Sequence, residues 1–297
     1  MKKDLEYYLA QARRIAEHRT KEAEKGIRKT YRELLKKLRY FISDEYADLS
    51  ENDKLTYAIL QQRGEYARFL SETEKIINAG LPEATKTVKA LVNNVYALCY
   101  IGMVDAVEKS ANLKELAKRL KGIRNVTPEV IKRAVENPIN GLTLNDVLEK
   151  NRREVIYDIK REIGLGLTNG DRYSTMAKRI SERLDMDYRK AVTIARTETH
   201  RVQEAGFHDC ATEINETLEQ GVTEWRLHKT WCSMEDERVR KTKKANHRKM
   251  NGVSIPVEEK FDLGRNIKTD APAQSGDASN DINCRCFLKY ELKEVKK

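Results

Sequence analysis

Apolar residues recur at the spacing of an amphipathic helix through about the first 120 positions of the chain. Lysine, arginine and glutamate fill the positions between them, as around Leu34, Leu38 and Ile42. Residues three and four apart lie on one face of a helix, so this pattern predicts long helices that each bury one stripe. Gly80-Leu81-Pro82 is a stop signal, and Pro82 in a first helical turn starts the next apolar segment.

A second helical section is expected after a loop near Gly122. Thr127 before Pro128 is typical of a helix start, with Thr127 as the N-cap, and Thr143-x-x-Asp146 resembles a capping box. An apolar stripe over residues 155–167 predicts one helix. Two further amphipathic helices are expected after it, the second beginning at about residue 187, with a soft domain boundary near residue 190.

Strand and loop patterns replace the helical pattern beyond residue 221. Residues 225–231 are strand-like, residues 253–257 alternate, residues 264–281 have a loop composition, and residues 286–290 fit a closing strand. We therefore expect a mainly α N-terminal region of long amphipathic helices followed by a small α+β C-terminal domain. The expected ranges are a helical N-terminal region at 1–125, a helical middle section at 126–190 and the α+β domain at 191–297.

Composition narrows the class of protein. The chain has 297 residues, of which 39% are apolar and 35% charged, enough for two domains with their own cores and a soluble surface. We see no apolar run near the roughly 20 residues that span a bilayer, and no secretory signal at the start. Five cysteines, an odd number in a chain of this size, do not fit a disulfide framework, so we expect a reducing compartment.

Positive charge is concentrated in the N-terminal part. Residues 191–297 hold 19 Lys and Arg against 18 Asp and Glu, whereas residues 1–190 hold 38 against 29, within a net charge of +10. Such an excess favours polyanions through counterion release, which would make nucleic-acid binding salt-dependent and independent of sequence. The alternative is a solvated helical surface, since lysine-rich helix faces are common in proteins that bind no nucleic acid.

An ordered series of aromatic, ionic, glycine and cysteine positions occupies the last third of the chain. It comprises Trp231, Asp236, Arg238, Arg240, His247, Gly252, Phe261, Pro272, Asn283, Cys284 and Cys286, preceded by Ala195-Arg196-Thr197-Glu198. With this series, residues from about 150 to 290 resemble the C-terminal domain of the phage Mu F-like minor head proteins, also called phage head morphogenesis proteins. One departure is Lys243-Lys244-Ala245-Asn246, an apparent insertion before His247 that leaves the pairing of this histidine open.

The resemblance implies a minor capsid protein of a tailed phage or prophage. Members of this family associate with the portal, so the resemblance implies portal, capsid or scaffold proteins as partners, and a role in procapsid assembly. It also implies genome packaging or delivery through non-specific contact with double-stranded DNA. The expected location is the inside of the head near the portal, after assembly in the host cytoplasm, and we expect no enzymatic activity and no membrane segment.

Four residues of the series have the chemistry of a zinc site. Cys232, His247, Cys284 and Cys286 offer soft or borderline ligands for a closed tetrahedral site, with His228 as a substitute, so zinc is the candidate cofactor. The Cys-x-Cys spacing is tighter than the usual zinc knuckle. The structural alternative is that Cys284 and Cys286 lie on a strand, one in the core and one outward.

Most of the other residues in the series fit a structural role. Asp236, Arg238 and Arg240 are expected to form a buried ion-pair network rather than a catalytic group. The residues expected to build the domain are Arg196, Glu198, Trp231, Asp236, Arg238, Arg240, Gly252 and Asn283. The run from Arg238 to Lys249 holds seven basic residues and no acidic one, and is either a DNA contact or a solvated loop. The candidate DNA contacts are Lys241, Lys243, Lys244, Arg248 and Lys249.

Two other classes of protein remain as alternatives. One is an enzyme, either a metal-dependent nuclease or a toxin-like transferase that uses Glu235 and Glu237, Arg196 or His247. Against it, the sequence has no paired carboxylates beside a base, no phosphate-binding glycine loop and no zincin motif, so no catalytic residue is assigned. The other is a nucleic-acid-binding module organised by zinc.

Overall fold

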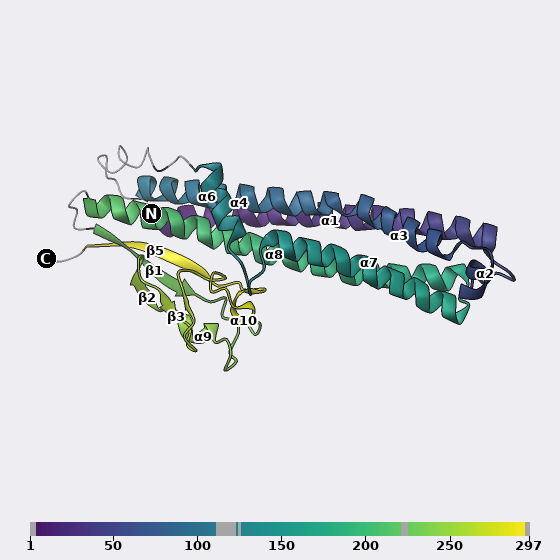
Figure 1. Ribbon diagram of the computed structural model, residues 1–297. Coiled ribbons are helices and arrows are strands. Elements are labelled where there is room, and N and C mark those ends of the chain that lie inside the picture. Colours follow the sequence, from purple (N-terminus) through teal and green to yellow (C-terminus); the bar gives the residue numbers. More distant parts are fainter. Residues whose placement is uncertain (1–3, 111–122, 124–125, 221–224, 295–297) are drawn as a thin grey trace. The chain divides into compact units, whose positions relative to one another are not determined.

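The computed structural model describes residues 4–110, 123, 126–220 and 225–294 (Figure 1). The chain forms two compact units, each built from separate segments. The sheet-bearing unit comprises Met1–Lys21, Ala90–Leu144 and Ala195–Lys297, and the helical unit comprises Glu22–Lys89 and Asn145–Ile194. These units cut across the three consecutive ranges expected from the sequence, because the longest helices contribute residues to both. The loop expected near Gly122 lies outside the described residues.

Long helices make up most of the described chain (Figure 1). They are α1 Leu5–Leu49, α2 Tyr57–Gln62, α3 Tyr66–Gly80, α4 Pro82–Ser110, α6 Pro128–Glu136, α7 Leu144–Asn169 and α8 Tyr173–Gln220, with short helices α9 His247–Met250 and α10 Ala278–Asp281. The strands are β1 Trp225–Cys232, β2 Ser254–Pro256, β3 Phe261–Asp262, β4 Lys268–Thr269 and β5 Phe287–Glu294. The predicted fold class, a mainly α region followed by a small α+β domain, is confirmed.

The helix boundaries follow local signals in the sequence. Helix α3 ends at Gly80 and α4 begins at Pro82, as the stop signal predicts. The Thr127 hydroxyl accepts a hydrogen bond from the Val130 amide at the start of α6, which satisfies one of the free amides of the first turn. The prediction of two helices on either side of residue 187 was wrong, because α8 runs unbroken for 48 residues. Asp187 is buried and paired with Arg183 at 2.9 Å, so its polar side chain does not end the helix.

In the sheet-bearing unit, α4 and α8 pack closely. The hydroxyl groups of Tyr96 and Tyr100 on α4 donate hydrogen bonds to the carboxylates of Asp209 and Glu213 on α8, at 2.7 and 2.6 Å. Between these contacts Gly206 lies so close to α4 that a Cβ atom there would be 2.6 Å from the Tyr96 carbonyl oxygen. The absence of a side chain at Gly206 therefore sets the spacing of the two helices.

The C-terminal part of this unit contains an antiparallel sheet of order β2-β1-β5 and a separate β3-β4 pair. Strand β1 pairs with β5 along its whole length, from Trp225 opposite Glu294 to Cys232 opposite Phe287. Alternate residues Leu227, Lys229 and Trp231 of β1 are buried, as the two-residue period of a strand requires. The strands expected near residues 225–231, 253–257 and 286–290 are confirmed.

Strand β5 lies at an edge of this sheet, where its backbone binds two charged side chains. The Leu288 amide donates to the buried Glu204 carboxylate of α8 at 3.0 Å, and the Arg13 guanidinium of α1 donates to the Leu288 carbonyl oxygen. The Arg13 guanidinium also lies over the rings of Phe207 and Phe287. The start of α1 is thus bound to the C-terminal sheet.

One helical stretch passes the length and composition test for a membrane span, contrary to the expectation that no apolar run approaches this length. It is Tyr66–Ser110, whose most apolar 18-residue window has a mean hydropathy of 1.4. Of that window, 56% is buried inside the structure. The core helix of a folded protein has the same apolar composition.

Candidate functional site

A buried cluster of one histidine and two cysteines lies where α9 meets the segment between α10 and β5. Nδ1 of His247 is 3.6 Å from the Cys284 sulfur and 3.5 Å from the Cys286 sulfur. All three residues are buried, and their potential ligand atoms lie within 4.8 Å of one another. Among the described residues this is the group whose side chains could together hold a metal ion.

Hydrogen bonds fix the orientation of the His247 ring. Its Nε2 atom is 3.1 Å from Oδ1 of Asn280. The amide nitrogen of the Asn280 side chain donates to Asp277 at 3.0 Å, which leaves Oδ1 of Asn280 to accept from His247. Nε2 therefore carries the proton, and the unprotonated Nδ1 faces the two sulfur atoms.

The two thiols and a second histidine influence one another. The contact between the two thiols raises the pKa of Cys284 and lowers that of Cys286, while burial works to raise both. His200 of α8 lies 2.8 Å from the Cys286 carbonyl oxygen through its Nε2 atom. Burial works to lower the pKa of His200, but its contacts with the Cys284 thiol, Glu204 and this carbonyl together raise it.

Two of the candidate zinc ligands do not join this cluster. Cys232 follows Trp231 on β1, so the two side chains point to opposite faces of the sheet. Because the Trp231 ring contacts the His247 ring at a centroid distance of 5.5 Å, Cys232 faces away from the cluster, and the same alternation places His228 on the Cys232 face. The alternative in which one of Cys284 and Cys286 points outward was wrong, since both are buried.

The loop before α9 contacts residues 280–286, called here the cysteine segment because they include Cys284 and Cys286, through further side chains. Asp236 accepts two hydrogen bonds from the Arg285 guanidinium, at 2.5 and 2.6 Å. Arg240 donates to the backbone oxygens of Asn280 and Ile282. Asp236, Arg240 and His247 thus all hold the segment from 280 to 286. The expectation of a buried ion-pair network is corrected in one respect, because Asp236 and Arg285 are partly exposed and Arg238 is 78% exposed.

The Asp236–Arg285 pair predicts a measurable pH effect. Hydrogen bonds from Arg285 lower the pKa of Asp236 from 3.8 to about 2. Because the folded-state pKa is depressed, this pair stabilises the fold above about pH 4 and the contribution is lost as the pH falls toward 2. In Arg285→Gln the pKa of Asp236 is expected to return toward 3.8, measured by NMR titration of the side-chain carboxyl carbon. Arg238→Gln, which removes a weaker contact at 3.7 Å, should change it less, and equal shifts would contradict the assignment.

The Ala-Arg-Thr-Glu segment of α8 faces the same part of the unit. Glu198 is buried and accepts from Nε of the buried Arg201 at 2.8 Å, and Arg201 in turn donates to the carbonyl oxygens of Ala134 and Val135 at the end of α6. The Thr197 hydroxyl accepts from the Asn283 amide at 3.2 Å, whereas Arg196 is exposed. This segment joins α6, α8 and the cysteine segment.

Two further residues of the series have backbone roles. Gly252 has φ of 83° and donates its amide to the Trp231 carbonyl at 2.8 Å, which brings the β2 strand beside β1. Asn283 has φ of 56°, in the left-handed region that asparagine tolerates better than most residues. The Trp231 side chain is buried between the rings of His247 and Phe261.

The structure places the candidate DNA contacts at the surface. Lys241, Lys243, Lys244, Arg248 and Lys249 are all exposed, on the loop before α9 and on α9 itself. Glu235 and Glu237, the candidate catalytic acids, are also exposed in a surface turn.

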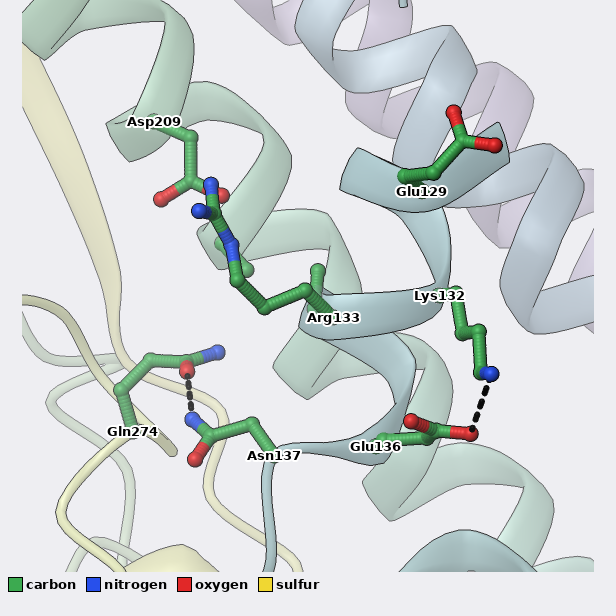
Figure 2. Close-up of a pocket in the computed structure, with 9 residues that line it drawn as sticks. Glu129, Lys132, Arg133, Glu136, Asn137, Asp209 and Gln274 are labelled. Carbon is green, nitrogen blue, oxygen red and sulfur yellow. Dashed lines mark hydrogen bonds and ion pairs between the residues drawn. The ribbon is translucent and has the colours of Figure 1, made fainter. Parts of the chain in front are cut away.

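A surface pocket elsewhere in the sheet-bearing unit is lined by polar groups that have partners. Figure 2 shows Arg133 of α6 pointing toward Asp209 of α8, with Asn137 bonded to Gln274 at 3.1 Å. The remaining lining residues are Glu129, Lys132, Ala134, Glu136 and Ala205. None of the site residues expected from the sequence lines this pocket.

Sequence reasoning missed the residues that orient the cluster and those that bind the elements around it. Arg201, Glu204 and His200 lie just after the Ala-Arg-Thr-Glu segment, within one helical face of α8. Asn280 follows its helix cap, Asp277, by three residues, and this N-cap spacing was a signal for α10. Nothing in the sequence indicated that Asn280 would bind His247, because 33 residues separate them.

The motif and the comparisons with known proteins identify the family. A family model described as "Phage Mu protein F like protein" matches residues 157–289, close to the range expected from the motif, and the chain is similar over most of its length to a phage minor head protein. The chain belongs to this phage Mu F-like family of minor head proteins. The similar protein is Minor head protein GP7 of Bacillus phage SPP1, 35% identical over 272 residues, which cover 91% of this chain and 82% of GP7.

A second relative carries a different name. The NAD(+)--arginine ADP-ribosyltransferase EFV of Enterococcus faecalis is 29% identical over 215 residues, which cover 72% of this chain but 41% of that protein. More than half of the transferase therefore lies outside the similar segment. No solved structure matches this chain.

Proposed function

We propose that this protein is a minor component of the head of a tailed phage or prophage, and that it associates with the portal protein during procapsid assembly. The observation that carries the proposal is the similarity to a minor head protein over 91% of the chain, which includes the N-terminal helices as well as the motif region. The inside of the head, near the portal, is the corresponding location.

A structural role without catalysis agrees with how the motif residues are used. Glu198, Asp236 and Arg240 are engaged in contacts within the fold. Glu235 is exposed, and its carboxylate accepts a hydrogen bond from the Asn251 side-chain amide at 2.5 Å. Incubation of the purified protein with labelled NAD+ and an arginine-containing acceptor should transfer no label. Transfer that survives Glu235→Gln and Glu237→Gln would place a transferase site elsewhere, and transfer abolished by them would favour the enzyme.

Portal association is tested by co-expression with the portal protein of the same phage. A tagged copy of this full chain should retain the portal protein at moderate salt, and the chain should be present in purified heads. A basic protein of similar size and charge, expressed in its place, controls for capture by charge alone. Equal capture by this control, or absence of the chain from purified heads, would defeat the proposal.

We also propose non-specific contact with double-stranded DNA through the exposed basic residues around α9. Lys241, Lys243 and Lys244 carry no acidic neighbour within the run from 238 to 249, and all three are exposed. Each cation that neutralises a phosphate contributes about 0.9 to the slope of log K against log salt concentration. The triple substitution of these lysines by glutamine should therefore reduce that slope by about 3.

The measurement is a fluorescence-anisotropy titration of duplex DNA at several salt concentrations. The matched control replaces Lys21, Lys25 and Lys29 of α1 by glutamine. These lysines are 65%, 74% and 78% exposed, and their substitution removes the same charge. A smaller change in the control locates the contact at the α9 loop. Equal changes would instead assign binding to overall charge, and an unchanged slope in both would exclude these lysines.

A further inference from the structure

The separations within the His247–Cys284–Cys286 cluster match those of a tetrahedral zinc site. Zinc lies about 2.3 Å from a thiolate sulfur and about 2.0 to 2.1 Å from an imidazole nitrogen, so tetrahedral geometry places the nitrogen about 3.6 Å from each sulfur. The observed distances from His247 Nδ1 are 3.6 Å to Cys284 and 3.5 Å to Cys286. Both nitrogen-to-sulfur distances are therefore those that a single zinc ion requires, and all three donor atoms lie within 4.8 Å of one another.

The ring orientation of His247 also suits a metal better than two thiols. Its Nδ1 lone pair can accept only one S–H hydrogen bond, yet two sulfur atoms lie at nearly equal distances from it. Histidines that bind metals commonly donate their other N–H to an oxygen that holds the ring in place. Asn280 provides that oxygen, and Asp277 fixes the Asn280 side chain.

The Trp231 ring packs against the cluster from β1, at a centroid distance of 5.5 Å from the His247 ring. Its indole N–H is buried and has no hydrogen-bond partner among the described residues. Two thiolates and one imidazole favour zinc over magnesium or calcium, which prefer oxygen ligands.

We propose that Nδ1 of His247 and the sulfur atoms of Cys284 and Cys286 bind one zinc ion, with Asn280, Asp277 and Trp231 orienting these ligands. This site is independent of portal association. His200 holds the Cys286 carbonyl oxygen and is a positioning residue, and the fourth position of the metal is left to a water molecule. The metal joins α9 to the segment that leads into β5, across a separation of 39 residues from His247 to Cys286, so its binding energy contributes to the folding of this part.

Metal analysis of the full-length chain, purified under reducing conditions without chelator, tests the site directly. We expect about one zinc per chain in the wild type, and less than about a fifth of that in His247→Gln, Cys284→Ser and Cys286→Ser. Cys232→Ser, on the opposite face of the sheet, should retain the metal. His200→Gln should also retain it, because a glutamine amide can still donate to the carbonyl oxygen. Loss of zinc in His200→Gln equal to that in His247→Gln would overturn the three-ligand assignment.

A second measurement on the wild type does not depend on the folding of any variant. Removal of the metal with a zinc chelator should lower the melting temperature, and added Zn2+ should restore it. Replacement by Co2+ should produce the intense visible bands of tetrahedral cobalt together with thiolate charge transfer in the near ultraviolet. Absence of stoichiometric zinc and of these bands would overturn the proposal. A Cys284–Cys286 disulfide in the purified protein, found by mass spectrometry before reduction, would do the same.

Discussion

Replacing Arg201 by leucine is expected to lower the free energy of unfolding by about 3 to 5 kcal/mol, the usual effect of removing one partner of a buried ion pair. Arg201 is 1% exposed, and its loss leaves the buried Glu198 carboxylate without its cation. It also leaves the carbonyl oxygens of Ala134 and Val135 at the end of α6 without their donors. Burial already raises the pKa of Glu198, so this carboxyl should take up a proton in the variant.

Equilibrium unfolding in urea, followed by circular dichroism, measures the effect. Arg238→Leu is the matched control, because it removes the same charge from a side chain that is 78% exposed, and its effect should stay within about 0.5 kcal/mol. The double variant Glu198→Leu with Arg201→Leu should recover part of the loss, since both charges are then absent. Similar losses of unfolding free energy in Arg201→Leu and Arg238→Leu would show that Arg201 does not bind α6 in solution.

Gly206→Ala is expected to destabilise the protein by about 3 kcal/mol, through overpacking against backbone atoms that cannot move independently. The added Cβ would lie 2.6 Å from the Tyr96 carbonyl oxygen and 3.2 Å from the Tyr100 amide nitrogen. Helices α4 and α8 would have to separate, which would lengthen the hydrogen bonds from Tyr96 and Tyr100 to Asp209 and Glu213.

Gly164→Ala provides the opposite expectation for the same chemical change. A Cβ at Gly164 of α7 meets no atom within 4 Å, so alanine should stabilise the helix by about 0.5 to 1 kcal/mol. Both variants are compared with the wild type by thermal and urea unfolding. A stabilising Gly206→Ala would show that the close approach of α4 and α8 is absent in solution.

Local patterns in the sequence predicted the elements of the fold well. The break at Gly80 and Pro82 and the cap at Thr127 depend on residues next to each other, so composition and spacing suffice to find them. The unbroken α8 could not be predicted in this way, because Asp187 is buried and paired with Arg183 of the same helix, and Arg183 also binds Asp158 of α7. The division into units also depends on which distant segments pack together.

The candidate site was predictable in its residues but not in its arrangement. The ligand chemistry of the motif residues indicated His247, Cys284 and Cys286, although their spacing is not that of a usual zinc knuckle, and the structure brings these three together. Cys232 was included because it is a cysteine near the motif, and the alternation of β1 then directs it to the other face. Asn280 and His200 act through contacts made across 33 and 86 residues, which no local pattern specifies.

The edge of the sheet at β5 has a consequence for contacts between copies of this chain. An edge strand with free amide and carbonyl groups can add a strand from a neighbouring molecule, which leads to aggregation. At Leu288 both groups are already occupied, the amide by Glu204 and the carbonyl oxygen by Arg13. A strand from a second molecule would have to displace a buried carboxylate and a guanidinium before it could pair at this position. The contact that joins α1 to the sheet therefore also protects copies of this chain from joining edge to edge.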